Sequence, residues 1–163
     1  VPFYVAISLI LGGIVLWKVD NKPVGRNPKN DLSTITRKQA LLVGLGQAVA
    51  VIPGVSRSGA SIVSGLLVGL SRPTATAFSF YLSIPVIVLA SGLKLVKYGN
   101  EIGNISGGLP AVMVGLVVSF IVALLAIKWL LRYIAHHNFC IFAIYRIIVG
   151  FAILLLIASG ILV

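Results

Sequence analysis

The chain has few charged side chains, and almost none of them are negative. Only 10% of its 163 residues are charged, three are acidic, and the formal net charge is +10. Soluble domains carry about 25% charged residues, whereas the mean hydropathy here is +1.11. A water-soluble fold is excluded, because a chain with 59% hydrophobic residues would expose too much apolar surface to stay dispersed.

The sequence is also poor in cysteine and lacks targeting features. Its single cysteine, Cys140, cannot form an intramolecular disulfide, which excludes a disulfide-stabilised scaffold. The abundance of apolar runs excludes disordered and collagen-like classes. No basic segment precedes the first apolar run, so the start is not a signal peptide. Because there is no initiator methionine, we expect the sequence to be a fragment of a longer chain.

The basic excess would indicate a nucleic-acid partner in a soluble protein, but in a membrane protein it indicates topology. Basic residues collect in cytoplasmic loops and contact anionic headgroups, so we expect no nucleic-acid partner. If residues 18–38 are cytoplasmic, Lys94 and Lys97 face the other side. The basic residues on the cytoplasmic side are then Lys18, Lys22, Arg26, Lys29, Arg37, Lys38, Arg72, Lys128 and Arg132. This bias predicts the orientation of the chain in the membrane.

Apolar segments divide the chain as expected for a single polytopic membrane domain over residues 1–163. Residues 3–17 form a first segment that is short for a span, because roughly 20 residues cross a bilayer. Segments of full spanning length lie at residues 74–93, 108–127 and 139–163. The predicted fold is therefore an all-α integral-membrane helix bundle.

Residues 39–70 break this pattern, because two short apolar segments meet at Pro53 and Gly54 and neither is long enough to cross. Such a pair is typical of a re-entrant helical hairpin whose tip lies at membrane depth. In the preceding polar loop, residues 18–38, Asp31 and Thr36 are candidate helix caps, together with Ser33. Irregular backbone at that depth needs protein or a water-filled cavity around it, so the tip is a candidate site.

The tip concentrates groups that bind anions. Gly54 and Gly59 allow a positive φ and close ligand approach, so successive N–H groups can form a nest at the start of the next helix. Arg57 adds a bidentate donor for phosphate oxygens. The accompanying hydroxyl groups belong to Ser56, Ser58 and Ser61. We predict phosphate as the ligand, because a charged residue this deep usually faces a cavity and serves function.

Simpler alternatives remain open for the polar residues. Pro53 and Gly54 could merely kink a helix, with Arg57 paired to a neighbour. His136 and His137 are expected at headgroup level, because adjacent histidines do not share a helical face at metal-ligand spacing. The position of Arg146 leaves open whether its side chain reaches the cytoplasmic face or lines the cavity.

Residues 47–61, QAVAVIPGVSRSGAS, resemble the second signature of the bacterial undecaprenyl-diphosphate phosphatases, the bacitracin-resistance membrane family. That signature reads Pro-Gly-x-Ser-Arg-Ser followed by a threonine. The similarity continues through residues 70–72, 78–85 and 142–150, so it covers essentially the whole chain.

The resemblance implies a role for each matching residue. Arg57 would bind the diphosphate and stabilise charge during transfer, and Ser56 would bind phosphate or assist the nucleophile. Ser61 takes the threonine position and is expected to keep the catalytic hydroxyl, without the methyl group that stiffens the rotamer. Substrate contacts are also expected from Gly54, Ser58 and Gly59.

The resemblance further implies that this chain is the second half of an inverted repeat. The Glu-x-x-x-Glu and Pro-x-Ser-Ser-x-Gly-His elements of the first repeat do not occur in this sequence. We therefore expect no metal ligands in this chain, and a divalent cation, Mg or Ca, is expected from the resemblance alone.

The implied function is an integral-membrane hydrolase in the bacterial plasma membrane that converts undecaprenyl diphosphate to undecaprenyl phosphate and phosphate, recycling the cell-wall lipid carrier. The expected partners are a polyprenyl diphosphate and membrane lipids, and a homodimer is left open. The alternative is a lipid-phosphate transporter or flippase, because transporters also hold anionic substrates between broken helices at the midplane. Lipid phosphatases of the acid-phosphatase type also use a Ser-Arg pair, but their pattern requires a downstream His-x-x-x-Asp. They are excluded, because no aspartate follows Asp31.

Overall fold

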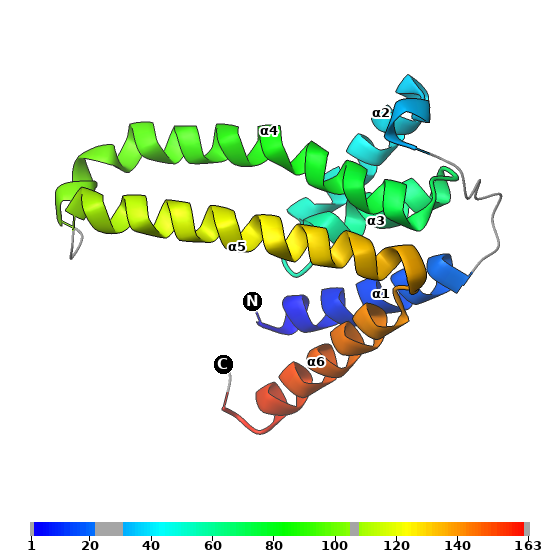
Figure 1. Ribbon diagram of the computed structural model, residues 1–163. Helices are drawn as coiled ribbons and strands as arrows, with labels where there is room; N and C mark the ends of the chain where they lie inside the picture. The colour runs from blue at the N-terminus through cyan, green and yellow to red at the C-terminus, as the bar shows by residue number, and fades with distance from the viewer. Residues whose placement is uncertain (1, 22–30, 105–107, 162–163) are drawn as a thin grey trace.

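The computed structural model describes residues 2–21, 31–104 and 108–161 of the chain. The elements in order are α1 (Pro2–Asn21), η1 (Leu32–Thr34), α2 (Arg37–Gln47), η2 (Ala48–Val51), α3 (Arg57–Leu67), α4 (Arg72–Tyr98), η3 (Gly99–Asn104), α5 (Gly108–His136) and α6 (Cys140–Ala158). The η elements are short 3₁₀ helices. All elements in the described ranges are helical, which confirms the predicted all-α bundle (Figure 1).

Four helices of the described chain, α1, α4, α5 and α6, are long and apolar enough to cross a membrane. The first segment is longer than residues 3–17, because α1 has 20 residues and continues to Asn21. Likewise α4 continues past Lys94, and α5 continues past Lys128. Long basic side chains near a helix end can extend to the interface, so a lysine or arginine need not end the helix.

Helices α2 and α3 form the hairpin that the sequence predicts. Each has 11 residues, which corresponds to about 16 Å and is too short for a hydrocarbon core of about 30 Å. Thr36 caps α2, because its Oγ1 accepts the Gln39 N–H at 3.2 Å. The Gln39 amide then donates to the Val68 carbonyl oxygen at 3.0 Å, which ties the start of α2 to the end of α3. The hairpin tip reaches part-way along α4 and α5 (Figure 1).

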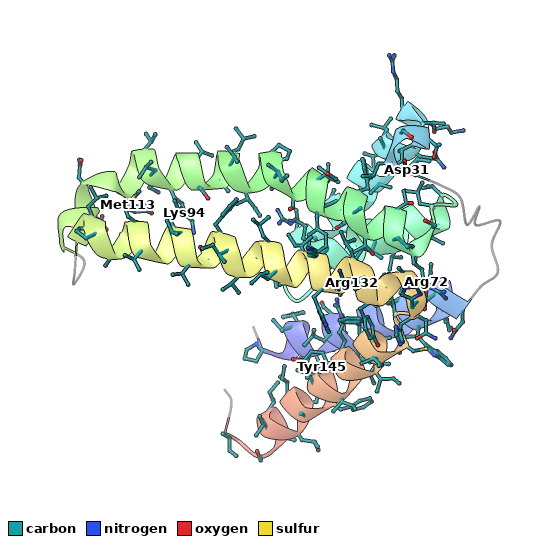
Figure 2. All side chains as sticks on the ribbon, viewed as in Figure 1. Asp31, Arg72, Lys94, Met113, Arg132 and Tyr145 are labelled. Atoms are coloured by element: carbon teal, nitrogen blue, oxygen red, sulfur yellow. The ribbon has the colours of Figure 1, made fainter. Side chains whose placement is uncertain are left out.

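One end of the bundle, here named the basic end, is where α1, α3 and α5 finish and α2, α4 and α6 begin (Figure 1). Asp20 joins three of these elements. Its carboxylate accepts Arg72 Nε at 2.6 Å and the Phe139 N–H at 2.9 Å, and its carbonyl oxygen accepts Arg72 Nη2 at 3.1 Å. Figure 2 shows Arg72 beside the end of α1. The prediction that Asp20 lies in a polar loop is wrong, because these bonds bury it to 1% exposure.

Helices α1 and α6 pack closely because glycines stand at their contact. A Cβ on Gly150 would lie 2.6 Å from Ile10 Cγ1, and a Cβ on Gly13 would lie 2.8 Å from the Ala143 carbonyl oxygen. Close approach at small residues is the usual way in which membrane helices associate. The far halves of α4 and α5 instead extend beyond the other helices and expose apolar side chains (Figure 1).

Candidate functional site

The hairpin tip turns at Gly54 and rests against α1. Gly54 has a φ of +87°, which L side chains rarely adopt. A Cβ built there would lie 2.7 Å from Val5 Cα, so there is no room for a side chain. The sequence predicts a positive φ at this position, and the structure shows it together with the α1 contact that the sequence did not reveal.

Helix α3 begins directly after the tip, with Ser56 as its cap. The Ser56 hydroxyl accepts the Gly59 N–H at 3.1 Å and lies 3.1 Å from the Ser58 hydroxyl. The N-terminus of a helix carries a partial positive charge that favours anions. The two serines and Arg57 therefore lie where an anion is stabilised by the backbone as well as by side chains.

Arg57 and Ser58 face a cavity of about 560 Å³ that α3 forms with α4 and α5. The remaining lining residues are Ser79, Phe80, Ser83, Ile87, Ala123, Ala126, Ile127 and Leu130. On α4 this lining starts 7 residues and ends 15 residues after Arg72, which places it about 10–22 Å from the basic end. We call this space the Arg57 cavity, and it lies beside the middle of the apolar helix α4.

Ser61 lies behind the first turn of α3 rather than in a cavity. It is fully buried, at 0% exposure. Its hydroxyl lies 3.0 Å from the Arg57 carbonyl oxygen, 3.1 Å from the Ser58 carbonyl oxygen and 2.6 Å from the Ser79 hydroxyl. These contacts hold the turn against α4, and the catalytic role implied by resemblance stays a prediction.

Ser79 is a site residue that sequence reasoning missed. It contacts Ser61 and also lines the Arg57 cavity. A signal was present, because Thr76, Ser79 and Ser83 recur at helical spacing in an otherwise apolar span.

Arg146 of α6 also reaches the tip, which answers the question that its sequence position leaves open. Its Nη2 lies 3.5 Å from the Gly54 carbonyl oxygen. Two cavities, of about 380 and 300 Å³, are each lined by Arg146, Ser56 and Gly59. We call them the Arg146 cavities. The same turn of α3 therefore has an arginine on two sides.

The residues around the tip do not fit a divalent cation, because their side chains are arginines and serines. Within the described ranges, no group of three or more His, Cys, Asp or Glu residues could hold a metal ion.

His137 lies at the exposed end of α5, with its ring stacked on Tyr133 at 4.3 Å between centroids.

Comparison with known proteins identifies the family. A family model described as "Bacitracin resistance protein BacA" matches residues 1–152. The chain belongs to the BacA family. This confirms the resemblance that residues 47–61 carry, and with the four apolar helices it makes the chain a multi-pass protein of the bacterial inner membrane.

Curated relatives match over nearly the whole of this BacA-family chain. An undecaprenyl-diphosphatase of Deinococcus radiodurans is 43% identical over 99% of the chain and 58% of that protein. An undecaprenyl-diphosphatase of Albidiferax ferrireducens is 48% identical over 98% of the chain and 58% of that protein. One of Acinetobacter baumannii is 44% identical over 94% of the chain and 56% of that protein. The chain thus spans somewhat more than half the length of these relatives.

Proposed function

We propose that this chain contributes the phosphate-binding part of an integral-membrane phosphatase that hydrolyses undecaprenyl diphosphate to undecaprenyl phosphate and inorganic phosphate. One observation carries the proposal: Arg57, at the N-terminus of α3, lines a cavity beside the middle of the apolar helix α4. Relatives named undecaprenyl-diphosphatase, 43% and 48% identical to this chain, support the same activity.

The cavity suits a lipid that ends in a phosphate group. Arg57 and Ser58 of α3 are polar, as are Ser79 and Ser83 of α4, whereas Ile87 and Ile127 contribute to an apolar wall from α4 and α5. A volume of about 560 Å³ lies within the usual range of about 300–1,000 Å³ for small-molecule sites. The apolar wall would contact the prenyl chain and the polar end would bind the headgroup.

Phosphoryl transfer depends mainly on positioning and on stabilising charge, and these residues can supply both. The Arg57 guanidinium donates two hydrogen bonds to phosphate oxygens, and the N-terminus of α3 stabilises the remaining charge. The oxygen of a water molecule bonds to the terminal phosphorus as the bond from phosphorus to the bridging oxygen breaks. The bridging oxygen leaves on the lipid monophosphate, one proton of the water stays on the inorganic phosphate, and the other is released to solvent. Ser56 and Ser58 orient the phosphate through their hydroxyls.

A divalent cation is proposed from the family resemblance alone. The side chains at the tip do not fit one, so its ligands would come from residues other than those that surround Arg57. We derive no step of the reaction through it, and the assay below includes magnesium or calcium.

The test separates hydrolysis from transport. The full-length product of the gene is reconstituted in vesicles with undecaprenyl diphosphate, and phosphate release and transbilayer movement of the lipid are measured together. We expect Arg57→Gln to abolish phosphate release. Arg132→Gln, at an exposed arginine, should leave it unchanged. Lipid movement without phosphate release would contradict the proposal and support the transporter alternative.

A further inference from the structure

The guanidinium of Arg146 lies in a cradle built from three glycines on three segments. A Cβ on Gly12 of α1 would lie 2.7 Å from Arg146 Nη2, and a Cβ on Gly59 of α3 would lie 3.0 Å from Nη1. The carbonyl oxygen of Gly54 at the tip lies 3.5 Å from Nη2. Any side chain at positions 12 or 59 would push against the guanidinium, so the glycines keep its position beside the start of α3.

This cradle leaves the hydrogen-bonding capacity of Arg146 largely unused. A guanidinium has five N–H donors, and the bond to Gly54 is at the long limit of a hydrogen bond. Its Nε is buried without a hydrogen-bond partner among the described residues. An arginine in this condition is costly inside a membrane unless an anion joins it.

Among the residues that the structure describes, no carboxylate is placed to be that anion. Its three acidic residues are Asp20, Asp31 and Glu101. Asp20 holds Arg72 and the Phe139 N–H at the basic end, and Asp31 caps η1. Glu101 lies in η3, beyond the far end of α4. The described residues thus leave Arg146 beside open space, where an anion fits.

The space around Arg146 and the Arg57 cavity border two of the same residues. The smaller Arg146 cavity is lined by Ser58 and Leu130, and both residues also line the Arg57 cavity. Arg146 and Arg57 thus flank one turn of α3, with the hydroxyls of Ser56 and Ser58 between them. A ligand with one phosphate would engage one arginine, whereas a ligand with two linked phosphates can engage both.

We propose that Arg146 is a second phosphate-binding residue, which holds one phosphate of a lipid diphosphate while Arg57 holds the other. It selects diphosphate over monophosphate, because only a ligand with two linked phosphates engages both arginines at once. The proposal rests on the proposed function for the identity of the lipid. The anion selectivity follows from the Arg146 geometry.

The first test measures binding and turnover in the full-length protein. Binding of inorganic pyrophosphate and of inorganic phosphate is compared by calorimetry, and KM is measured for undecaprenyl diphosphate. Arg146→Gln is expected to raise KM and weaken pyrophosphate binding by about 10- to 100-fold, because hydrogen bonds to a charged group are lost. Phosphate binding should change much less. Arg146→Lys should recover part of the loss, since lysine keeps the positive charge but lacks the paired N–H donors of a guanidinium.

Gly12→Ala provides a second test that keeps the charge. The added methyl group would lie 2.7 Å from Nη2 and displace the guanidinium, so it should raise KM even if Arg146→Gln fails to fold. Gly92→Ala is the matched control, because nothing lies within 4 Å of a Cβ at that position. Thermal melting of each variant shows which effects come from misfolding.

The outcomes separate this inference from the proposed function. Normal KM and normal pyrophosphate binding in folded Arg146→Gln and Gly12→Ala variants would overturn the role of Arg146, even if Arg57→Gln is inactive. Absence of phosphate release from the wild type, with pyrophosphate binding that still depends on Arg146, would overturn the hydrolase and leave the two-arginine anion site.

Discussion

Variants of the buried hydroxyl pair on Ser61 and Ser79 test whether Ser61 positions the start of α3 or takes part in the chemistry. Their oxygens are 2.6 Å apart, and Ser79 is 3% exposed. Ser61→Ala removes the partner of Ser79 and should lower the free energy of unfolding by about 1–3 kcal/mol. The double variant with Ser79→Ala should cost less than the sum of the two single variants.

This prediction is checked by denaturation in detergent alongside phosphate release. If Ser61 positions the first turn of α3, activity should follow the folded fraction closely. Loss of turnover in a variant of undiminished stability would show instead that the Ser61 hydroxyl takes part in the chemistry.

Gly54 is the residue at which the backbone leaves least freedom for substitution. Gly54→Ala should lower the free energy of unfolding by at least about 2 kcal/mol, since a positive φ costs about 1–2 kcal/mol and the methyl group meets α1. Gly44→Ala is the control, because nothing lies within 4 Å of its Cβ and Ala is favoured by about 0.5–1 kcal/mol in a helix. Equal stability of the two variants would contradict the tip geometry.

Residues that act within a local segment could be predicted, and residues that act across the chain could not. The cap at Ser56 and the turn at Gly54 depend on neighbours a few positions away, so their residue types are informative. Arg146 meets Gly54 across 92 positions, and Asp20 meets Phe139 across 119. Inside a membrane the apolar faces of a helix look alike, so the sequence does not say which face meets a neighbour.

At the scale of elements, the contacts of Asp20 hold α1, α4 and the start of α6 together at the basic end. Asp20→Asn should lower the free energy of unfolding by about 1–3 kcal/mol, because the buried carboxylate that accepts Arg72 Nε and the Phe139 N–H loses its charge. Asp31→Asn is the matched control, since asparagine also caps helices and the site is exposed.

Chemical denaturation of the detergent-solubilised protein measures the difference between these two variants. If Asp20→Asn proves no more destabilising than Asp31→Asn, the Asp20 contacts do not hold the elements together.

The lengths of the elements were predicted less well than their number. Apolar runs located every spanning helix, because hydropathy is what a bilayer selects. The predicted spans end at residues 93 and 127, whereas α4 and α5 continue through Lys94 and Lys128. Backbone hydrogen bonds persist at the interface while the long side chains extend to water, so a charge marks the membrane boundary rather than the helix boundary.

At the scale of the whole molecule, the excess of basic residues at one end predicts orientation. In a Cys140→Ser background, a cysteine introduced by His136→Cys at the basic end should react only from the cytoplasmic side. One introduced by Asn100→Cys, at the opposite end in η3, should react only from outside. Labelling of intact cells with an impermeant thiol reagent measures this, and the reverse pattern would show that the basic end faces outward.

The central claim is that the turn of α3 with Arg57 is a phosphate site that serves hydrolysis of a lipid diphosphate. The most direct measurement is the rate of phosphate release from undecaprenyl diphosphate by full-length Arg57→Gln, relative to full-length Arg132→Gln at equal folded fraction. We predict a loss of at least about 100-fold, as expected when a main charge-stabilising group is removed. Equal rates for the two variants would contradict the claim.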